Sequence, residues 1–372
     1  MDEGLNLLRN QIDTIDKSLL ELFYKRMDVC RQVADYKKEN KLPVFQGNRE
    51  KEILDNVRKI SPDNLEDASV FLITAIMDIS KVLQQREIFS DKKFIDYKIP
   101  QFEKDAAVGC PGTVGANSHT ASLNIFPENK ISFFENFEDV CKAVESGEIK
   151  YGILPIHNST AGSVIQTYEL LEKYDLYICA STCVEVKHCL AAKKGTTLSD
   201  FKDVYSHPQA LSQCSNYLKE NGFTPKSYSN TALAAEMIAN SDIKAAAICS
   251  EHCAEIFGLD ILKKCINNVA ANFTKFICVT KECMIAPMAD TLSIMLTLPN
   301  QCGSLQRLLT KFMVNNLNMK KIESRPLKNG SYDFSFHIEF EGSVKDKNVI
   351  SLLHDLKNNT ENFKFFGNYY EI

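Results

Sequence analysis

Glycine is scarce at the start of this chain. Only two of its fifteen glycines, Gly4 and Gly47, fall in the first hundred residues. Because glycine is a principal marker of turns, this scarcity favours long helices that give way to a turn-rich region near residue 106. The chain also lacks any apolar stretch near the roughly eighteen residues that a membrane-spanning helix needs. We therefore expect no membrane partner.

Long blocks of like charge are missing as well. The net charge is −5 and the isoelectric point is about 5.9, which argues against a nucleic-acid-binding surface. The first residues, MDEGLNLLRN, are polar and charged and contain no apolar signal-peptide run. We expect a cytoplasmic protein with no nucleic-acid partner.

The thirteen cysteines include no repeated Cys-X-X-Cys pair. Scattered through apolar segments, they are typical of reduced thiols used as small core residues, and we expect neither a metal nor an organic cofactor. One alternative stays open. The sequence CSEHC could place Cys249, His252 and Cys253 on one helical face as ligands of a metal-dependent hydrolase, although the local sequence supplies no fourth zinc ligand.

Residues 1–92 are predicted to form an all-α domain. The first helix spans residues 5–40 and ends before Pro43, the second spans 48–60 with Asn48 as N-cap, and the third follows Pro62 with Asp63 or Asn64 as its cap. Three helices of unequal length cannot enclose the apolar seam of the first. We therefore expect a second copy of the chain to cover it.

Two further domains are predicted after a charged linker at residues 90–105. Residues 104–282 alternate short apolar runs with helical patterns, which predicts a bilobed α/β domain with a mostly parallel sheet. Residues 290–372 follow the order βαββαβ, which is typical of a small α+β, ferredoxin-like module.

One position interrupts the apolar seam of the first helix, because Arg26 lies between Leu22 and Val29. Arg26 and Lys37 are eleven residues apart and therefore within about 20° of the same helix face, whereas Arg9 lies about 100° away. Other polar side chains fall at helix positions that could join them, namely Arg49, Glu50, Ser80 and Gln84. Together they suit a small, doubly anionic, hydroxylated ligand. The alternative is that Arg26 lies at a surface and pairs with a neighbouring acid.

The segment LLRNQIDTIDKSLLELFYKRMDVCRQVADYKK, together with LPVFQGNREKEIL and ISKVLQQR, resembles the AroQ-type chorismate mutase domain, an all-helical dimer. This resemblance implies that chorismate is rearranged to prephenate, with catalytic roles for Lys37, Glu50 and Gln84. It also implies substrate binding by Arg26, Arg49, Ser80 and, from the partner chain, Arg9. An aspartate of the family pattern is replaced by Gln46.

The ordered motifs VGCPGTVGANSH, YGILPIHNSTAGSV, VKHCL, DVYSHPQALSQC and NFTKF resemble the prephenate dehydratase domain, which is bilobed like type II periplasmic binding proteins. The resemblance implies conversion of prephenate to phenylpyruvate, with catalytic roles for Asn158, Ser206, Gln213 and Thr274 and substrate binding by Ser159, Thr160 and Lys275. Lys275 replaces an arginine of the family and His157 replaces a glutamate. A non-catalytic domain that senses aromatic acids, beside an active mutase, is therefore the alternative.

The motifs IESRP and CGSLQRLL resemble the ESRP and GALV motifs of the ACT regulatory domain. The resemblance implies phenylalanine as an effector between two such modules, bound by Gly303, Ser304, Leu305, Asn318, Glu323, Ser324, Arg325 and Pro326. In this order the three resemblances imply a bifunctional P-protein of phenylalanine synthesis, feedback-inhibited and at least dimeric. The sequence leaves open whether prephenate or its transaminated analogue arogenate is preferred.

Overall fold

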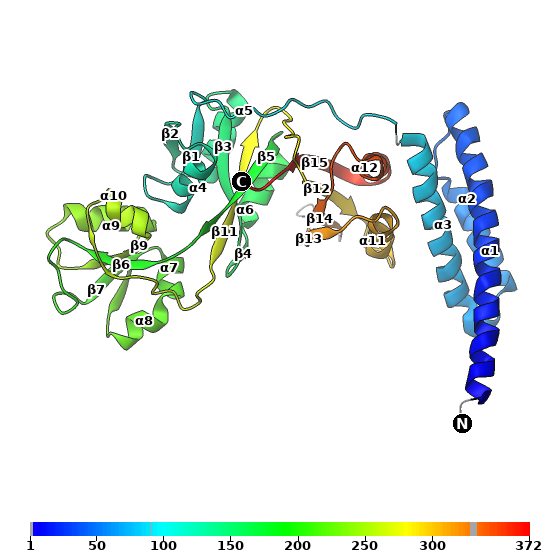
Figure 1. Ribbon diagram of the computed structural model, residues 1–372, viewed down its shortest axis with the longest axis horizontal. Helices are drawn as coiled ribbons and strands as arrows, with labels where there is room; N and C mark the ends of the chain where they lie inside the picture. The colour runs from blue at the N-terminus through cyan, green and yellow to red at the C-terminus, as the bar shows by residue number, and fades with distance from the viewer. Residues whose placement is uncertain (1–2, 90, 328–332) are drawn as a thin grey trace. The chain divides into compact units, whose positions relative to one another are not determined.

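The computed structural model describes residues 3–89, 91–327 and 333–372, which form two compact units (Figure 1). Unit 1 consists of Met1–Asp96 and Asp290–Phe365, and unit 2 of Tyr97–Ala289 and Phe366–Ile372. The predicted all-α region and most of the C-terminal module therefore share one unit. The bilobed α/β region makes up nearly all of the other.

The N-terminal region is all-α, as predicted. Its helices are α1 (Glu3–Glu39), α2 (Gly47–Ile60) and α3 (Glu66–Phe89). Two predicted caps were wrong. Asn48 lies inside α2, whose N-cap is Gln46 with no side-chain capping bond. Asp63 and Asn64 belong to a 3₁₀ turn, Asp63–Leu65, which tightens the chain before α3 begins.

The seam of α1 is covered by its own chain only in part. Met27 and Ala34 are buried, and α3 contributes the buried Met77 and Val82. By contrast, a row of large apolar side chains on α1 is about half exposed, as in Ile12 (56%). The other members of this row are Leu5, Leu8, Ile15, Leu19, Leu22 and Val29. None of the described helices is both long enough and apolar enough to cross a membrane.

The C-terminal module has the predicted order βαββαβ. Its elements are β12 (Thr291–Leu298), α11 (Ser304–Val314), β13 (Met319–Pro326), β14 (Phe334–Glu341), α12 (Lys347–Asn359) and β15 (Glu361–Tyr369). The strand order is β13-β14-β12-β15. Ser331 and Tyr332, where the strand now called β14 was predicted to begin, lie outside the described residues.

Helix α3 packs against the two helices of this module. The Gln85 amide donates to Asp355 Oδ1 at 3.3 Å, and Arg86 Nη2 donates to the carbonyl of Val314 at 3.0 Å. The rings of Phe89 and His354 stack with their centroids 4.7 Å apart. Unit 1 is therefore held together along α3 by polar and aromatic contacts.

Unit 2 has two lobes, as predicted. The sheet of the first lobe has the order β2-β1-β3-β11-β5, and its strands are Ile131–Phe134, Val108–Pro111, Tyr151–Asn158, Phe273–Thr280 and Tyr177–Glu185. A short strand, β4 (Gly162–Ser163), pairs with β3. The helices of this lobe are α4 (Asn117–Ile125), α5 (Phe137–Ser146) and α6 (Ile165–Lys173).

The sheet of the second lobe has the order β10-β6-β9-β7-β8, with strands Asp260–Lys263, Cys189–Ala192, Ala246–Cys249, Asp203–Ser206 and Thr224–Ser227. Its helices are α7 (Pro208–Gln213), α8 (Ser215–Glu220), α9 (Thr231–Asn240) and α10 (Glu251–Ile256). The prediction of a mostly parallel sheet was wrong, because β11 runs antiparallel to both β3 and β5 and β6 runs antiparallel to β9. A strand that returns late in the chain need not follow a βαβ crossover.

Both faces of the second sheet are packed, which explains its continuous apolar strands. Leu190 and Ile248 belong to one buried cluster, while their neighbours Ala191 and Ala247 belong to another. Cysteines serve as core residues, as predicted. All thirteen are unpaired thiols, and burial raises the pKa of buried members such as Cys214 to about 12.

Gly367 in β15 allows a close backbone approach and provides a stability test. It has a φ of +155°, and a Cβ there would overlap the carbonyl oxygen of Ile178. Gly147 has a φ of +82° but open space around it. We expect Gly147→Ala to cost about 1–2 kcal/mol of backbone strain, and Gly367→Ala to cost more than about 3 kcal/mol because backbone must move as well.

Denaturant unfolding of the full-length variants, followed by loss of structure in unit 2, measures this difference. Equal destabilisation by the two substitutions would contradict the packing described for Gly367.

Candidate active sites

A small cavity of about 110 Å³ lies among the three N-terminal helices. We call it the helical cavity. Its walls include side chains that the sequence predicted as catalytic or substrate-binding, together with four that it did not assign and the substituted Gln46. The predicted members are Arg26, Lys37, Arg49, Glu50, Ser80 and Gln84, and the unassigned ones are Cys30, Val44, Met77 and Lys81.

Arg26 connects two helices across this cavity. Its guanidinium donates a hydrogen bond from α1 to the Ser80 hydroxyl on α3, and Ser80 is itself buried. Arg26 is only partly exposed and forms no ion pair within the described residues. The alternative that Arg26 pairs with a surface acid therefore does not describe this structure.

Lys37 is withdrawn from water, with 8% of its surface exposed. Its ammonium donates to the carbonyl of Val44 at 2.8 Å and approaches Gln84 Oε1 at 3.5 Å. Desolvation lowers the pKa of Lys37, and the nearby Glu50 opposes this effect only in part. A positive charge is thus held by neutral oxygen atoms.

Glu50 forms an ion pair that the sequence analysis missed. Lys81 lies 3.2 Å from Glu50 and 2.7 Å from Asp78. Lys81 follows Ser80 directly and lies one turn before Gln84, so helical spacing was the available signal. Arg49 lines the cavity and also pairs with Glu52 at 2.6 Å.

Arg9 is separate from these residues within one chain. It is exposed, approaches only Asn6 at 3.4 Å among the described hydrogen bonds, and does not line the helical cavity. The helical cavity of a single chain, lined by Arg26 and Arg49, therefore lacks the further arginine that the sequence analysis expects from a partner.

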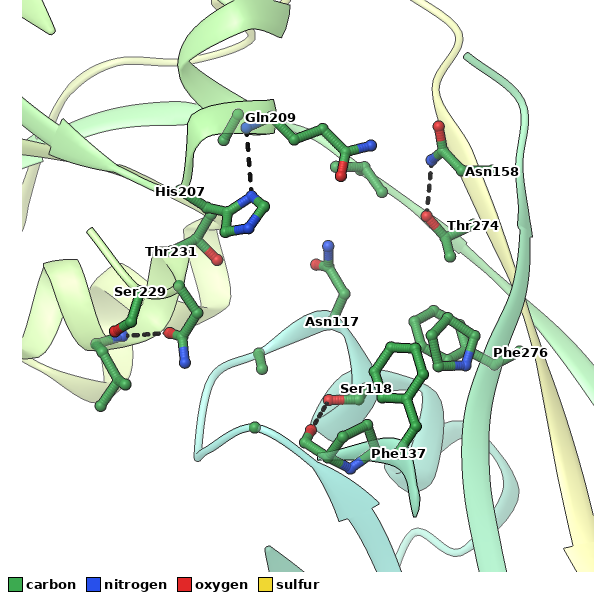
Figure 2. A pocket seen from close by; sticks show the side chains of 18 of the residues that line it. Asn117, Ser118, Phe137, Asn158, His207, Gln209, Ser229, Thr231, Thr274 and Phe276 are labelled. Atoms are coloured by element: carbon green, nitrogen blue, oxygen red, sulfur yellow. Dashed lines mark hydrogen bonds between the residues drawn. The ribbon is translucent and has the colours of Figure 1, made fainter. Parts of the chain in front are cut away.

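A larger cavity of about 730 Å³ separates the two lobes of unit 2 (Figure 2). We call it the interlobe cleft. Asn158 ends β3 and Thr274 lies near the start of β11, and the two residues are paired in register. The Asn158 amide donates to Thr274 Oγ1 at 2.9 Å, a contact visible in Figure 2. Because Thr274 accepts this bond, its hydroxyl hydrogen remains available to donate to another acceptor.

A buried network of amides supports this pair. Asn272, which the sequence analysis did not assign, is 1% exposed and accepts from Asn158 at 2.9 Å. It also donates to Gln213 Oε1 at 3.2 Å, and Gln213 in turn donates to Thr160 at 3.0 Å. The network brings Asn158, Thr160, Gln213 and Thr274 together across the two lobes. Asn272 precedes Thr274 by two residues and is the first residue of the motif NFTKF. The motif could therefore have indicated that Asn272 belongs to the site.

Four predicted residues lie outside the lining of the cleft, namely Thr160, which belongs to the amide network, and Ser159, Ser206 and Lys275. Ser206 is fully buried and donates to the carbonyl of Ile248 at 2.7 Å. Ser159 accepts from the backbone amide of Phe273 at 2.9 Å. The ammonium of Lys275 lies 5.5 Å from the ring centroid of Tyr369, because successive side chains of a strand point to opposite faces and Thr274 faces the cleft.

Among the described residues, no lysine or arginine lines the cleft. Instead, the N-terminal ends of α4 and α9 reach it through Asn117 and Thr231, and His207 lies at the start of α7. Unpaired amides at a helix N-terminus attract anions. Burial lowers the pKa values of His207 and His188, so both imidazoles are predominantly neutral at neutral pH.

The predicted effector residues occupy two parts of the C-terminal module. Gly303 caps α11 with a φ of +83°, and Ser304 and Leu305 follow it. Glu323, Ser324, Arg325 and Pro326 end β13, where Arg325 pairs with Glu323 at 2.7 Å. Asn318 donates to Glu341 at 3.2 Å.

The CSEHC sequence is part of the core of the second lobe. Cys249 and Cys253 are buried, and the ring of His252 stacks on that of His119 with centroids 6.1 Å apart. Within residues 3–89, 91–327 and 333–372, no group of three histidine, cysteine or acidic side chains is arranged to hold a metal ion. The metal-dependent hydrolase has no support in this geometry.

A cationic helical cavity and a cleft between two lobes, lined by amides, imidazoles and the carboxylate of Glu135, define a two-site enzyme that handles small organic acids. Comparison with known proteins identifies the family. Residues 8–85 match the sequence model of type II chorismate mutases, and residues 108–284 match that of prephenate dehydratases.

Relatives extend this match over the whole chain. It is 30% identical over 371 residues to the bifunctional chorismate mutase/prephenate dehydratase of Aquifex aeolicus, with 99% of this chain and 98% of the relative covered. It is 36% identical over 276 residues to the arogenate dehydratase/prephenate dehydratase 1 of Arabidopsis thaliana, covering 69% and 70% of the two chains.

Among solved structures, prephenate dehydratase from Arthrobacter aurescens in complex with L-Phe is 26% identical with a TM-score of 0.66, over 71% of this chain and 89% of that one. The chain belongs to the bifunctional chorismate mutase/prephenate dehydratase family and carries both enzyme domains.

The burial of Lys37 predicts a distinctive pH dependence of the mutase reaction. Its folded-state pKa lies below the ordinary 10.5, so the ammonium is present at neutral pH and is lost earlier than usual as the pH rises. We expect the mutase kcat/KM to fall on the alkaline side with a midpoint below 10.5. Lys37→Arg, which stays charged, should lose that fall. A wild-type profile that is level to beyond pH 10.5 would contradict the assignment.

Proposed function

We propose that the helical cavity rearranges chorismate to prephenate and that the interlobe cleft converts prephenate to phenylpyruvate. The observation that carries the proposal is the gathering of Arg26, Lys37, Glu50, Ser80 and Gln84 around one cavity. The amide network around Thr274 supports the second reaction. Both substrates are small dianions, which suits the cations of one site and the helix N-termini of the other.

The first reaction needs no nucleophile. In a pericyclic rearrangement, the protein holds a folded substrate and stabilises the charge that develops as the ether bond breaks. Arg26, placed by Ser80, binds one carboxylate. Lys37 and Gln84 donate to the ether oxygen; this requires the Gln84 amide to turn its nitrogen inward, since its oxygen now faces Lys37. Glu50 accepts from the ring hydroxyl, with Lys81 holding its carboxylate in place.

The second carboxylate of chorismate requires another cation, which Arg9 of a partner chain would supply. The half-exposed apolar seam of α1 supports association through this helix, because such a surface is stabilised when a second copy buries it. Arg9 lies on α1, on a different face from Arg26. We therefore propose a dimer in which each helical cavity is completed across the interface, with Arg49 as a further substrate contact.

In the cleft, prephenate loses CO₂ and water. The carboxylate leaves as CO₂, its bonding electrons enter the ring, and the ring hydroxyl departs as water after accepting one proton. Thr274 donates that proton, and the amide of Asn158 stabilises the oxygen that remains. Gln213 closes the site from the opposite lobe and donates to Thr160, with Ser159 and Ser206 fixing the adjoining backbone. Aromatisation provides the driving force.

Two departures from the family pattern bear on binding. Lys275 cannot offer the planar fork of an arginine, and its ammonium lies near Tyr369. It would therefore contribute positive charge from outside the lining. The carboxylates of prephenate are then bound mainly by the N-termini of α4 and α9. His157, opposite Lys275 in register, occupies the position of the family glutamate.

The C-terminal module is proposed to be an ACT regulatory domain that binds phenylalanine between two copies. Its βαββαβ order supports this, as does the relative from Arthrobacter aurescens that was crystallised with L-Phe. Gly303, Ser304 and Leu305 of one copy would face Glu323 to Pro326 of the other, with Asn318 nearby. We also propose that the protein is cytoplasmic.

The two activities can be separated by substitution. With chorismate as substrate, we expect the wild type to form prephenate and then phenylpyruvate. Thr274→Ala should accumulate prephenate, with dehydration slowed by about 100-fold or more, whereas Thr274→Ser keeps a hydroxyl and should retain much of the rate. Lys37→Ala should stop at chorismate yet still dehydrate added prephenate. Wild-type enzyme that makes prephenate but never phenylpyruvate would favour the sensor alternative.

The shared helical site can be tested by mixing inactive subunits. Arg9→Ala and Arg26→Ala should each abolish most mutase activity. A heterodimer of the two variants contains one intact site, so co-expression should restore about a quarter of the wild-type mutase activity in a statistical mixture. Mixed Arg26→Ala and Lys37→Ala subunits are the matched control, and these should not complement, because both residues belong to one chain's cavity. Failure of the Arg9 mixture to complement would place Arg9 and Arg26 in the same chain's site.

A further inference from the structure

A second cavity of unit 1, about 530 Å³ in volume, lies where α3 and the loop before α2 meet the C-terminal module. We call it the module cavity. Asp78, Lys81 and Gln85 contribute from α3, while Arg307 and Lys311 contribute from α11. Spacings of three, four and seven residues place each set on one face of its helix. Of the residues given a part in the two reactions above, only Lys81, which holds the Glu50 carboxylate, lines this cavity.

Two oxygen atoms in its wall are buried without a hydrogen-bond donor. They are Oδ2 of Asp78 and Oε1 of Gln85, whose side chains are 6% and 5% exposed. The remaining polar atoms of both residues are satisfied: Asp78 Oδ1 pairs with Lys81, and Gln85 donates to Asp355. A buried acceptor without a donor is unfavourable. A ligand with several N–H groups would satisfy both oxygens.

The other side of the cavity offers the opposite charge. Arg307 is exposed and has no ion-pair partner in the described part of the chain, whereas Lys311 is already paired with Asp355 at 2.7 Å. An available guanidinium is a strong ligand for a carboxylate. Between the two sides, Phe45, Leu298 and Leu308 supply an apolar wall. Acceptors, a cation and an apolar surface thus border one space.

From this arrangement we propose that the module cavity binds an apolar α-amino acid. Its ammonium would donate to Asp78 and Gln85, its carboxylate would bind Arg307, and its side chain would contact Phe45 and Leu308. A cavity of this size accommodates such a ligand. The site lies within a single chain, whereas the effector site proposed above requires Glu323 to Pro326 of a second module; the two share Ser304 at the start of α11.

Binding of an amino acid in the module cavity should affect the rate of the mutase reaction. Lys81 lines both the module cavity and the helical cavity, and it is the residue that connects Asp78 to Glu50. An ammonium bound to Asp78 competes with Lys81 for the same carboxylate. Lys81 then pairs more closely with Glu50, which leaves Glu50 a weaker acceptor for the substrate hydroxyl. Binding should therefore lower the mutase kcat/KM.

Calorimetric titration of the full-length protein tests the site. The probes are L-phenylalanine and L-leucine, with 3-phenylpropionate as a probe that lacks the ammonium. Arg307→Gln and Asp78→Asn should each weaken amino-acid binding in the module cavity at least tenfold. Arg58→Gln, an exposed arginine of α2, is the control and should change nothing. We expect two L-phenylalanine molecules per chain in the wild type and one in Arg307→Gln.

The possible results are distinguishable. One molecule per chain in the wild type, lost in Arg307→Gln, supports the module cavity and removes the effector site between modules. Equal binding in the wild type and in both variants overturns the module cavity, as does no binding of either amino acid. Binding of 3-phenylpropionate as tight as that of L-phenylalanine overturns the role of Asp78 and Gln85.

The coupling is tested by mutase kinetics. Saturating ligand should lower the mutase kcat/KM at least twofold in the wild type and not in Arg307→Gln. An unchanged rate overturns the coupling through Lys81.

Discussion

Two cations without a carboxylate partner, Lys37 buried and Arg26 partly exposed, determine the character of the helical part of this enzyme. Arg26 donates to the Ser80 hydroxyl, and Lys37 donates to a backbone carbonyl and approaches a side-chain amide. Neutral acceptors hold the charges in place but do not neutralise them, so the cavity retains a strong preference for an anion. The same bonds connect α1 to α3, which means that the packing of the helices and the binding of substrate depend on one set of contacts. In the proposed mechanism Arg26 and Lys37 are already positioned for the transition state, and such pre-arranged charge is the main way in which a protein can accelerate a reaction that needs no proton transfer.

The interlobe cleft offers a dianionic substrate a different set of binding groups. Among the described residues its lining contains no lysine or arginine, and its polar groups are amides, hydroxyls, imidazoles, the N-terminal ends of helices and the carboxylate of Glu135. This difference follows from the chemistry, since the second reaction removes a carboxylate as CO₂. A tightly paired cation would stabilise the carboxylate that has to leave, whereas helix N-termini spread a weaker positive potential over the site. Asn272 shows how such a site is kept in order, because its two ends satisfy Asn158 and Gln213 from different lobes.

Helix α3 connects two cavities of unit 1, one among the N-terminal helices and one against the C-terminal module. One face of α3 lines the helical cavity, and an adjoining face lines the module cavity against α11 and α12. Lys81 belongs to both, so an event on one side of the helix changes the electrostatics on the other. The half-exposed seam of α1 adds the possibility that a partner chain shares in this coupling. The two cavities would then be coupled because a bound ammonium and Lys81 compete for Asp78, and this coupling needs no large rearrangement.

Much of the local structure and most of the helical site could be predicted because both depend on spacing along one helix. The 3.6-residue period is enough to bring Arg26 and Lys37 to one face, and the order of apolar runs is enough to predict two lobes and the βαββαβ module. Long-range pairing could not be predicted in this way. The antiparallel position of β11 depends on which sheet edge remains when the chain returns, and it decides that Thr274 faces the cleft while Lys275 does not. Likewise, Ser206, Lys81 and Asn272 acquire their roles from partners distant in sequence, because burial and hydrogen bonding are properties of the packed chain and not of its local pattern.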